Sequence, residues 1–287
     1  MISRPGTEAR RAAVLGSPVD HSLSPALHRA GFAAIGLTGW TYEKIECDGE
    51  RLPALVAACG PEWAGFSVTM PGKSVAAAVA DVRSPRVIEL GVANTLYRGP
   101  AGWYAENTDV DGVTGALSAV GLAPRRVLVL GGGGTARSVV AALAEMGVAE
   151  LIVAGRRPQS TADCAALAAR LGVEVTECGL DEESVSAAAT GVDLVVSTIP
   201  AGGADHLADA LAAVPALFDV VYHPWPTPLA AASPAGRVTV TGLDMLLHQA
   251  FRQFELFTAR AAPRAQMRAG LRAASGTELP LPIGTPG

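Results

Sequence analysis

One junction in the chain indicates the fold before any other feature: Val127-Leu128-Val129-Leu130, followed directly by Gly131-Gly132-Gly133-Gly134-Thr135-Ala136-Arg137. The four apolar residues form a short continuous run, which is typical of a buried parallel strand. The turn reads G-x-G-x-x-A, and a helical stretch follows it to about Met146. A strand, a glycine-rich turn and a helix together place a pyrophosphate at a helix N-terminus. The junction therefore predicts a dinucleotide-binding domain.

The residues after the next strand indicate which dinucleotide is bound. A second strand is expected at Leu151-Ile152-Val153-Ala154, and Gly155-Arg156-Arg157 follows it. An acidic residue at this point would hydrogen-bond the ribose of NAD, whereas arginine suits the 2′-phosphate of NADP. The alternative is a glycine-rich loop that binds nothing, but it would not explain four consecutive glycines, since each costs backbone entropy. We therefore expect NADP as the cofactor.

The composition is that of a folded protein rather than a disordered or membrane-spanning one. The chain has 287 residues, which suggests two domains or one large one, and 49% of them are hydrophobic while 17% are charged. The net charge of −5 gives no reason to expect nucleic acid or an anionic membrane as a partner. No apolar run reaches membrane length, and the N-terminus lacks a signal-peptide core.

The cysteines indicate a reducing compartment. Cys47, Cys59, Cys164 and Cys178 have no C-x-x-C spacing, and no histidines cluster beside them. A zinc site or a disulfide framework is therefore not expected. We expect reduced thiols in a cytoplasmic enzyme that holds no metal.

Strands and helices alternate along the chain. In the first half, strands are expected at 12–15, 40–45 and 66–70, a hairpin at 95–98 and 103–105, and helices at 52–59 and after Gly72. Another helix should begin at Ser24-Pro25, with the serine as N-cap and the proline at the first helical position. In the second half, strands are expected at 127–130, 151–154, 194–197, 217–221 and 238–240, and the last two helices at 245–260 and 263–274.

This order predicts an α/β fold of two domains. More than 100 residues precede the glycine-rich turn, enough for a separate domain. Residues 1–108 are expected to form a substrate-binding catalytic domain, completed by C-terminal helices within 242–275. Residues 109–241 are expected to form a Rossmann-like, doubly wound parallel sheet that binds NADP, and 276–287 a flexible tail.

Three polar segments of the first half are candidates for chemistry. Ser22 and Ser24 put two hydroxyls beside a helix start, which suits a carboxylate, although ordinary capping by Ser24 is an equally good interpretation. Thr69 stands at a strand end with Lys73 four residues later, where the alternative is a solvated surface lysine. Asp109 precedes a helix and could be its N-cap as well as a catalytic group.

Taken together, these segments resemble the shikimate dehydrogenase family, NADP-dependent enzymes that reduce 3-dehydroshikimate to shikimate. The resemblance extends from about residue 12 to about 272. Seven segments carry it in the family's order: Ser22-Leu23-Ser24-Pro25, Ser67-Val68-Thr69-Met70-Pro71-Gly72-Lys73, Ala93-Asn94-Thr95, Asn107-Thr108-Asp109, the Gly131–Arg137 turn, Ser197-Thr198-Ile199-Pro200, and Gly242-Leu243-Asp244-Met245-Leu246 through Gln249. The implied activity belongs to the shikimate pathway, which leads to chorismate and the aromatic amino acids.

The resemblance also implies a role for individual residues. Ser22 and Ser24 would hold the substrate carboxylate, and Lys73 with Asp109 would form a catalytic dyad. The ring hydroxyls would be bound by Thr69, Lys73, Asn94, Asp109 and Gln249, with Tyr222 close by. The cofactor would be bound by Gly131, Gly132, Gly133, Gly134, Thr135 and Ala136 at the pyrophosphate, Arg156 and Arg157 at the adenosine phosphate, Thr198, and Val220 and Gly242 near the nicotinamide.

Four positions depart from the family's usual pattern. Ser67 replaces a common asparagine, Gly72 a common aromatic residue or histidine, and Glu106 a common glycine. Gly155-Arg156-Arg157 replaces the usual Asn-Arg-Thr, which affects the exact phosphate contacts rather than the preference for NADP. The first three leave the lysine and the aspartate of the dyad intact.

The implied chemistry agrees with the residue types. Reduction of a ring ketone needs a hydride, which NADPH would supply, and a proton at the oxygen. An ammonium at Lys73 can stabilise the developing alkoxide, and Asp109 can orient it; either could be the formal proton donor. Because the site would be split between the two domains, hinges are expected near Asp109 and Gly242.

Three other functions fit these residues less well. An NAD-dependent quinate/shikimate dehydrogenase would favour an acidic residue in place of the arginines, and a non-catalytic binding protein would have lost Lys73 or Asp109. A folate-linked dehydrogenase would not carry the Ser22-x-Ser24 turn. We therefore expect a small-molecule oxidoreductase, as a monomer or homodimer.

Overall fold

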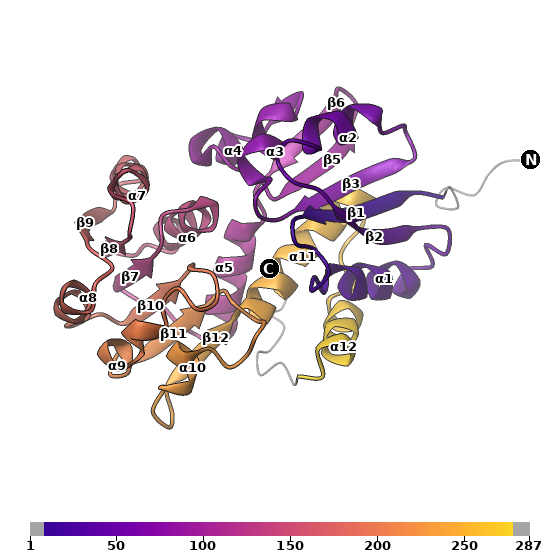
Figure 1. Ribbon diagram of the computed structural model, residues 1–287. Helices are drawn as coiled ribbons and strands as arrows, with labels where there is room; N and C mark the ends of the chain where they lie inside the picture. Colours follow the sequence, from indigo (N-terminus) through magenta and orange to yellow (C-terminus); the bar gives the residue numbers. More distant parts are fainter. Residues whose placement is uncertain (1–8, 278–287) are drawn as a thin grey trace, which may run out of the picture. The chain divides into compact units, whose positions relative to one another are not determined.

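The computed structural model describes residues 9–277 (Figure 1). They form two compact units. The first unit consists of the residues up to Asp111 together with those from Leu246 onward. The second unit consists of Gly112–Met245. The chain passes from one unit to the other inside two helices, α5 (Asp109–Ala119) and α11 (Gly242–Thr258). Of the tail expected at 276–287, residues 278–287 lie outside the described part.

The first unit contains a six-stranded mixed sheet of order β2-β1-β3-β5-β6-β4. Its strands are β1 (Arg11–Gly16), β2 (Thr41–Glu46), β3 (Trp63–Val68), β4 (Val82–Arg83), β5 (Thr95–Gly99) and β6 (Gly102–Glu106). Strand β1 is parallel to β2 and β3, whereas β5 is antiparallel to β3 and β6. The three strands and the hairpin expected from the sequence are confirmed. Strand β4 was not expected, because two residues are too few to show a periodicity.

Helices cover both faces of this sheet. They are α1 (Ser24–Ala34), α2 (Leu52–Ala58), α3 (Lys73–Val79), α4 (Pro85–Leu90) and α12 (Arg264–Ser275), together with the part of α11 after Met245. On one face, side chains of α2, α3 and α4 pack on Leu15, Phe66 and Leu96. On the other, α1 packs against β2, and α12 lies beside α1 (Figure 1). Gly65 of β3 is needed there, since a Cβ would lie 2.2 Å from the Phe257 ring of α11.

Two helix starts differ from the sequence prediction. Helix α4 was not expected, although Ser84-Pro85 is an N-cap followed by proline, and the Ser84 side chain accepts a hydrogen bond from Val87 N. The prediction that Ser24 caps α1 is wrong. The N-cap is Leu23, which already has helical φ and ψ and offers no side-chain cap, so Ser24 is the first helical residue.

The second unit contains a six-stranded sheet of order β12-β11-β10-β7-β8-β9, and every neighbouring pair of strands in it is parallel. Its strands are β7 (Arg126–Leu130), β8 (Glu150–Ala154), β9 (Glu174–Cys178), β10 (Leu194–Ser197), β11 (Ala216–Asp219) and β12 (Val238–Thr241). This confirms the doubly wound parallel sheet. Strand β9 was not expected because it lies at an edge and carries mostly exposed polar residues, without the apolar run of an inner strand.

The helices of this unit lie in two groups. They are α6 (Gly134–Glu145), α7 (Pro158–Arg170), α8 (Glu182–Ala188), η1 (Asp205–Leu207), α9 (Ala208–Leu211) and α10 (Pro228–Ala231). Helices α6 and α7 pack on each other, and side chains of α8, α9 and α10 pack in a separate cluster with Leu128, Ile152 and Leu217 of the strands. The strand expected at 217–221 ends at Asp219, and the helix expected from Met245 begins at Gly242.

The described part of the chain contains no helix that is both long and apolar enough to cross a membrane. All four cysteines are free.

Candidate active site

One edge of the first sheet gathers the polar segments of the first unit. Strands β1 and β3 are parallel, so their carboxyl ends lie at the same edge. Gly16 is the last residue of β1, and Thr69 directly follows β3. Strand β5 runs the opposite way, and its first residue, Thr95, pairs with Ser67 and with Glu106 at the end of β6. The residues just outside these strand ends therefore lie close together.

A short ion pair at this edge joins Lys73 and Asp109. Lys73 is the first residue of α3, Asp109 is the first residue of α5, and Lys73 Nζ lies 2.5 Å from Asp109 Oδ2. Their side chains are only 15% and 8% exposed. Both charges are thus largely removed from water but paired with each other, which is the condition under which a buried charge is tolerated.

Asn94 holds the other oxygen of the same carboxylate. Its Nδ2 donates to Asp109 Oδ1 at 2.9 Å and to Gln249 Oε1 at 3.3 Å. Its Oδ1 accepts from the backbone N–H of Thr108 at 2.7 Å, which fixes the orientation of the amide because a backbone N–H can only donate. Lys73, Asn94, Asp109 and Gln249 are therefore linked by direct contacts, and both oxygens of Asp109 are engaged.

The first turn of α5 is held in place by further contacts. Arg86 Nη1 donates to Asp111 Oδ2 at 2.8 Å and to the backbone oxygen of Asn107 at 3.2 Å. Burial raises the pKa of Asp111, and the Arg86 guanidinium opposes that shift. Glu106, which departs from the family's glycine, accepts at 2.8 Å from both Ser84 Oγ and Asn107 N. These contacts fix the segment that carries Asp109.

Ser22 and Ser24 contact each other in the turn before α1. Ser22 Oγ donates to Ser24 Oγ at 3.3 Å, and both residues are buried. Glu46 of β2 holds the start of this turn, since it accepts from Ser17 Oγ at 2.6 Å and from Val19 N at 3.2 Å. Two adjacent hydroxyls in a fixed turn can donate together to a carboxylate.

Thr69 lies over the end of β1. Its backbone N–H donates to Leu15 O at 2.8 Å, and a Cβ at Gly16 would lie 2.3 Å from Thr69 Cγ2. Glycine at position 16 therefore allows the threonine to approach the strand end from which the Ser22–Ser24 turn departs.

The glycine-rich turn of the second unit leaves β7 at its carboxyl end and enters α6. Gly131 has φ +110°, which favours glycine, and a Cβ there would lie 2.4 Å from Thr198 Oγ1. A Cβ at Gly132 would lie 2.7 Å from the backbone oxygen of Ser160, while Gly133 faces open space. Gly133 is the N-cap of α6 and supplies no side-chain cap, so the first N–H groups of the helix point to a site that a pyrophosphate fits.

Arg156 and Arg157 are exposed at the carboxyl end of β8, next along the sheet. Gly155 lets the chain turn there, since its Cβ would lie 2.5 Å from Thr161 Oγ1 of α7. Two guanidinium groups beside the glycine-rich turn can bind a phosphate ester on the cofactor. The residues of this edge thus fit NADP.

A third segment follows β11 and β12. A Cβ at Gly242 would lie 2.1 Å from Val220 O and 3.1 Å from the Tyr222 ring, so glycine is required for this approach. Burial raises the pKa of Tyr222, which keeps its hydroxyl protonated. Asp219 fixes the loop by accepting from Thr227 Oγ1 at 2.7 Å and from Val221 N at 3.1 Å.

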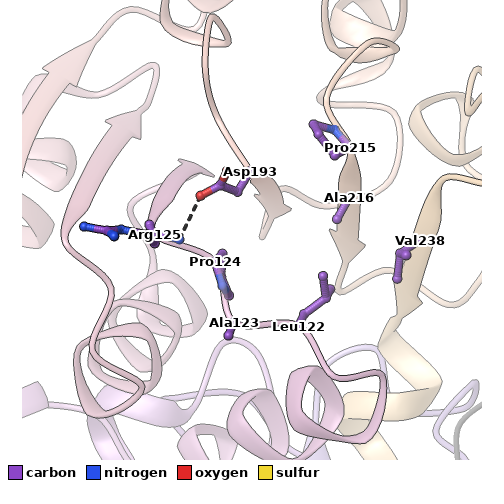
Figure 2. A pocket seen from close by; sticks show the side chains of 8 residues that line it. All are labelled: Leu122, Ala123, Pro124, Arg125, Asp193, Pro215, Ala216 and Val238. Atoms are coloured by element: carbon purple, nitrogen blue, oxygen red, sulfur yellow. Dashed lines mark hydrogen bonds between the residues drawn. The ribbon is translucent and has the colours of Figure 1, made fainter.

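A hollow of about 390 Å³ lies elsewhere in the second unit, at the amino ends of its strands (Figure 2). Apolar residues such as Leu122, Pro215 and Val238 line it, and Asp193 accepts from the backbone N–H of Arg125, whose side chain points away from the hollow. It contains none of the predicted site residues. Ligands of open α/β sheets bind at the carboxyl ends of the strands, where the glycine-rich turn and the arginines lie.

Several residues that contact this site were not singled out from the sequence. Thr95 and Thr108 hydrogen-bond the Asn94 side chain, and Gln253 donates to the Asn94 backbone oxygen. Tyr42 is linked to Gln253 through Ser67. The motif around Asn94 and Asp109 contains both threonines, so position in the motif could have identified them. No local pattern marks Tyr42 or Gln253.

Comparison with known proteins identifies related sequences over most of the chain. A family model described as the shikimate dehydrogenase substrate binding domain matches residues 14–96, and one described as the shikimate 5'-dehydrogenase C-terminal domain matches residues 242–272. The shikimate dehydrogenase (NADP(+)) of Methylobacterium radiotolerans is 38% identical over 276 residues, which cover 91% of this chain and 95% of that protein.

Solved structures agree with these matches. A shikimate dehydrogenase structure from Mycobacterium tuberculosis is 49% identical, superposes with a TM-score of 0.87, and is matched over 92% of this chain and 99% of its own. The shikimate 5-dehydrogenase of Thermus thermophilus, in complex with NADP(H) and shikimate, is 31% identical with a TM-score of 0.78, over 92% and 99% of the two chains.

Proposed function

This chain belongs to the shikimate dehydrogenase family, and we propose that it catalyses the reversible NADPH-dependent reduction of 3-dehydroshikimate to shikimate. It is an NADP-dependent oxidoreductase of the shikimate pathway. The observation that supports the chemistry most directly is the Lys73–Asp109 ion pair, whose second carboxylate oxygen is held by Asn94.

Lys73 and Asp109 are proposed to act at the reacting oxygen of the substrate. When bound, NADPH supplies the hydride for the ring carbonyl. Lys73 places a positive charge where negative charge develops on the oxygen, and its ammonium can donate a proton there. Asp109 orients that ammonium through the 2.5 Å contact, and Asn94 keeps the carboxylate from rotating. A fixed pair needs little reorganisation as charge develops, which lowers the barrier.

The remaining residues of the first unit are assigned to substrate recognition. Ser22 and Ser24 donate to the substrate carboxylate, and Thr69, Asn94 and Gln249 bind its ring hydroxyls. The mutual contacts of Asn94 and Gln249, together with the fixed Ser22–Ser24 turn, support these roles, because polar groups held in place lose little freedom on binding. Tyr222, a residue of the second unit, is also proposed to contribute to substrate binding.

Cofactor binding is assigned to the second unit. The Gly131–Ala136 turn would hold the pyrophosphate, and Arg156 and Arg157 would bind the adenosine phosphate. Thr198 would support the glycine-rich turn, since its hydroxyl donates to Leu130 O directly before that turn. Val220 and Gly242 would lie near the nicotinamide. A cytoplasmic location is part of the same proposal, and the four free cysteines support it.

Steady-state kinetics with four combinations of substrate and cofactor test this function. The purified protein is supplied with shikimate or quinate and with NADP or NAD, and the appearance of reduced nicotinamide is followed. We expect kcat/KM to be at least about tenfold higher for shikimate with NADP than for any other pair, a difference of about 1.4 kcal/mol. A preference for quinate with NAD would instead support the catabolic alternative, and absence of turnover would support a binding protein.

A further inference from the structure

Three polar side chains are buried together beneath the substrate edge of the first sheet: Tyr42 of β2, Ser67 of β3 and Gln253 of α11. Their exposed fractions are 0%, 5% and 1%. Tyr42 Oη lies 2.5 Å from Ser67 Oγ, and Ser67 Oγ lies 2.6 Å from Gln253 Oε1. Because they are buried, they act on a ligand only through the residues that they hold.

The contacts of Gln253 determine how its amide is oriented. Gln253 Nε2 lies 3.2 Å from the backbone oxygen of Asn94, and a carbonyl oxygen can only accept. The amide NH₂ therefore faces Asn94, and Oε1 faces Ser67. Since Oε1 can only accept, the Ser67 hydroxyl donates to it, and Tyr42 in turn donates to Ser67. The donor and the acceptor of every hydrogen bond in this series are therefore determined.

The same amide reaches the catalytic aspartate through two intermediate residues. Gln253 Nε2 also donates to Thr95 Oγ1 at 3.0 Å, which leaves the Thr95 hydroxyl proton to donate to Asn94 Oδ1 at 2.9 Å. This bond adds to the one from Thr108 N, which donates to the same Oδ1 at 2.7 Å, and together they leave the Asn94 NH₂ group to Asp109 and Gln249. Gln253 thus adds a second bond to the Asn94 backbone oxygen, beside that of 2.7 Å from Val68 N, and supports the Asn94 side chain through Thr95.

Position 67 bears on the role of Gln253. Ser67 departs from the asparagine that the resemblance leads us to expect, and its hydroxyl is linked to Asn94 through the Gln253 amide. Gln253, 186 residues later in the sequence, places its amide from α11 beside Ser67 of β3 and Asn94, the residue before β5. The Ser67 hydroxyl and the Gln253 amide therefore together connect Tyr42 of β2 to Asn94, which a single longer side chain on β3 could otherwise do.

We propose that Gln253 is a positioning residue for shikimate, acting through Thr95 and Asn94, with Ser67 and Tyr42 as its anchor. The proposal rests on the proposed function, in which Asn94 binds a ring hydroxyl. It assigns a role in substrate affinity to a residue that touches neither substrate nor cofactor.

The test compares Gln253→Met with wild type. Methionine keeps the length and approximate volume of the side chain but removes both hydrogen bonds to the Asn94 segment. We expect the KM and the calorimetric Kd for shikimate to rise about tenfold, the loss of roughly one to two hydrogen bonds, with a smaller change in kcat and with KM for NADP unchanged. The matched control is Thr258→Val on the same helix. It removes the 2.7 Å bond to Phe254 O, so it can lower the melting temperature but leaves the shikimate constants at wild-type values.

A rescue experiment separates positioning from mere stability. Gln253→Ala alone should weaken shikimate binding at least as much as Gln253→Met. Adding Ser67→Asn to Gln253→Ala moves an amide from α11 onto β3, and we expect it to bring Kd back to within about threefold of wild type.

Two results overturn the inference. One is a Gln253→Met protein with wild-type KM and Kd for shikimate, whatever its melting temperature, and the other is a double variant no better than Gln253→Ala. Either result leaves the proposed function standing if the wild type oxidises shikimate. A wild-type protein that neither binds nor oxidises shikimate overturns both.

Discussion

Lys73 Nζ and Asp109 Oδ2 are 2.5 Å apart, although the two residues are separated by 36 positions and begin different helices, α3 and α5. A backbone hydrogen bond of 2.9 Å from Ala93 N to Lys73 O ties the start of α3 to the segment that carries Asn94. Asn94 in turn donates to the second oxygen of Asp109. The pair is thus held from both sides, and removing either charge leaves the other largely buried without its partner.

Substitution of the pair should affect turnover more than affinity. Lys73→Ala is expected to lower kcat by about 10²–10⁴-fold with a smaller change in the KM for shikimate, because its interaction grows as charge builds on the substrate oxygen. Lys73→Met, which keeps the length and removes the charge, should behave similarly. Stopped-flow and steady-state measurements with shikimate and NADP give kcat and the KM for shikimate of each variant.

Asp109→Asn and the double variant complete that test. Asp109→Asn should be strongly impaired, and Lys73→Ala/Asp109→Asn should be little worse than either single variant, since residues that act as a unit are not additive. Near-normal kcat in Lys73→Ala would contradict the proposed mechanism while leaving the fold and the family unaffected.

The arginines after β8 should decide cofactor preference. Each charge-assisted hydrogen bond to a phosphate contributes about 1.5–3 kcal/mol, so Arg156→Ala/Arg157→Ala should raise the KM for NADP by more than about tenfold and change that for NAD little. Arg170→Ala, at the other end of α7, is the control for loss of a positive charge in the same unit. Equal effects on the two cofactors would show that neither arginine contacts the 2′-phosphate.

The two serines before α1 should affect substrate binding without a capping effect. Ser22→Ala and Ser24→Ala are each expected to weaken shikimate binding by about tenfold or more, because a hydroxyl that donates to a carboxylate contributes about 1.5–3 kcal/mol. Binding of NADP should be unchanged. Isothermal titration of each variant with shikimate measures both effects.

Asp181→Ala is the matched control for these variants. Asp181 is the N-cap of α8 (Glu182–Ala188) in the second unit, and its side chain accepts from Ser184 N at 2.9 Å, so its loss should lower the free energy of unfolding by about 1 kcal/mol and leave shikimate affinity intact. Leu23, rather than Ser24, is the N-cap of α1, so Ser24→Ala should not show that loss. Unchanged shikimate affinity in both Ser22→Ala and Ser24→Ala would remove them from the carboxylate site.

His28 should make the protein less stable in acid. It is fully buried, its ring stacks on Tyr42 at 4.3 Å, and Phe32, Phe254 and Phe257 surround it. Burial lowers its pKa to about 3, and the neighbouring Gln253 offsets only part of that shift. The unfolded chain, with an ordinary pKa of about 6.5, therefore takes up the proton first as the pH falls.

The stabilisation by neutral His28 is complete above about pH 6.5 and decreases by about 1.4 kcal/mol per pH unit below it. Urea unfolding at a series of pH values between about 7 and 4 should show this slope in the wild type and a shallower one in His28→Phe, whose ring cannot be protonated. His248, with its pKa lowered to about 4 by burial, adds a parallel slope in both proteins. Identical slopes in the two proteins would mean that His28 is protonated in the folded state.

Local sequence patterns determined most of the framework. The apolar run at 127–130, its glycine-rich turn and the arginines after β8 lie within about 30 residues of one another, and each signal depends only on neighbours in the chain. The same holds for the inner strands and for the hairpin at 95–105. Elements at the edges, β4 and β9, were missed because edge strands are short or polar and carry no strong periodicity. The roles of the site residues came from the family's motifs, not from any local pattern.

Only the tertiary structure decided which polar groups meet and in what orientation. The contacts between Ser67 and Gln253, and between Lys73 and Asp109, depend on how β3, β5 and the starts of α3, α5 and α11 pack, since the residues are far apart in sequence. Ser24 shows the same limit at short range. Whether Ser24 caps α1 depends on the backbone angles of Leu23, which are already helical, and Glu46 of β2 holds the start of the same turn through Ser17 and Val19. Periodicity identifies an element from its own residues, whereas register, helix start and hydrogen-bond direction are set by the elements packed against it.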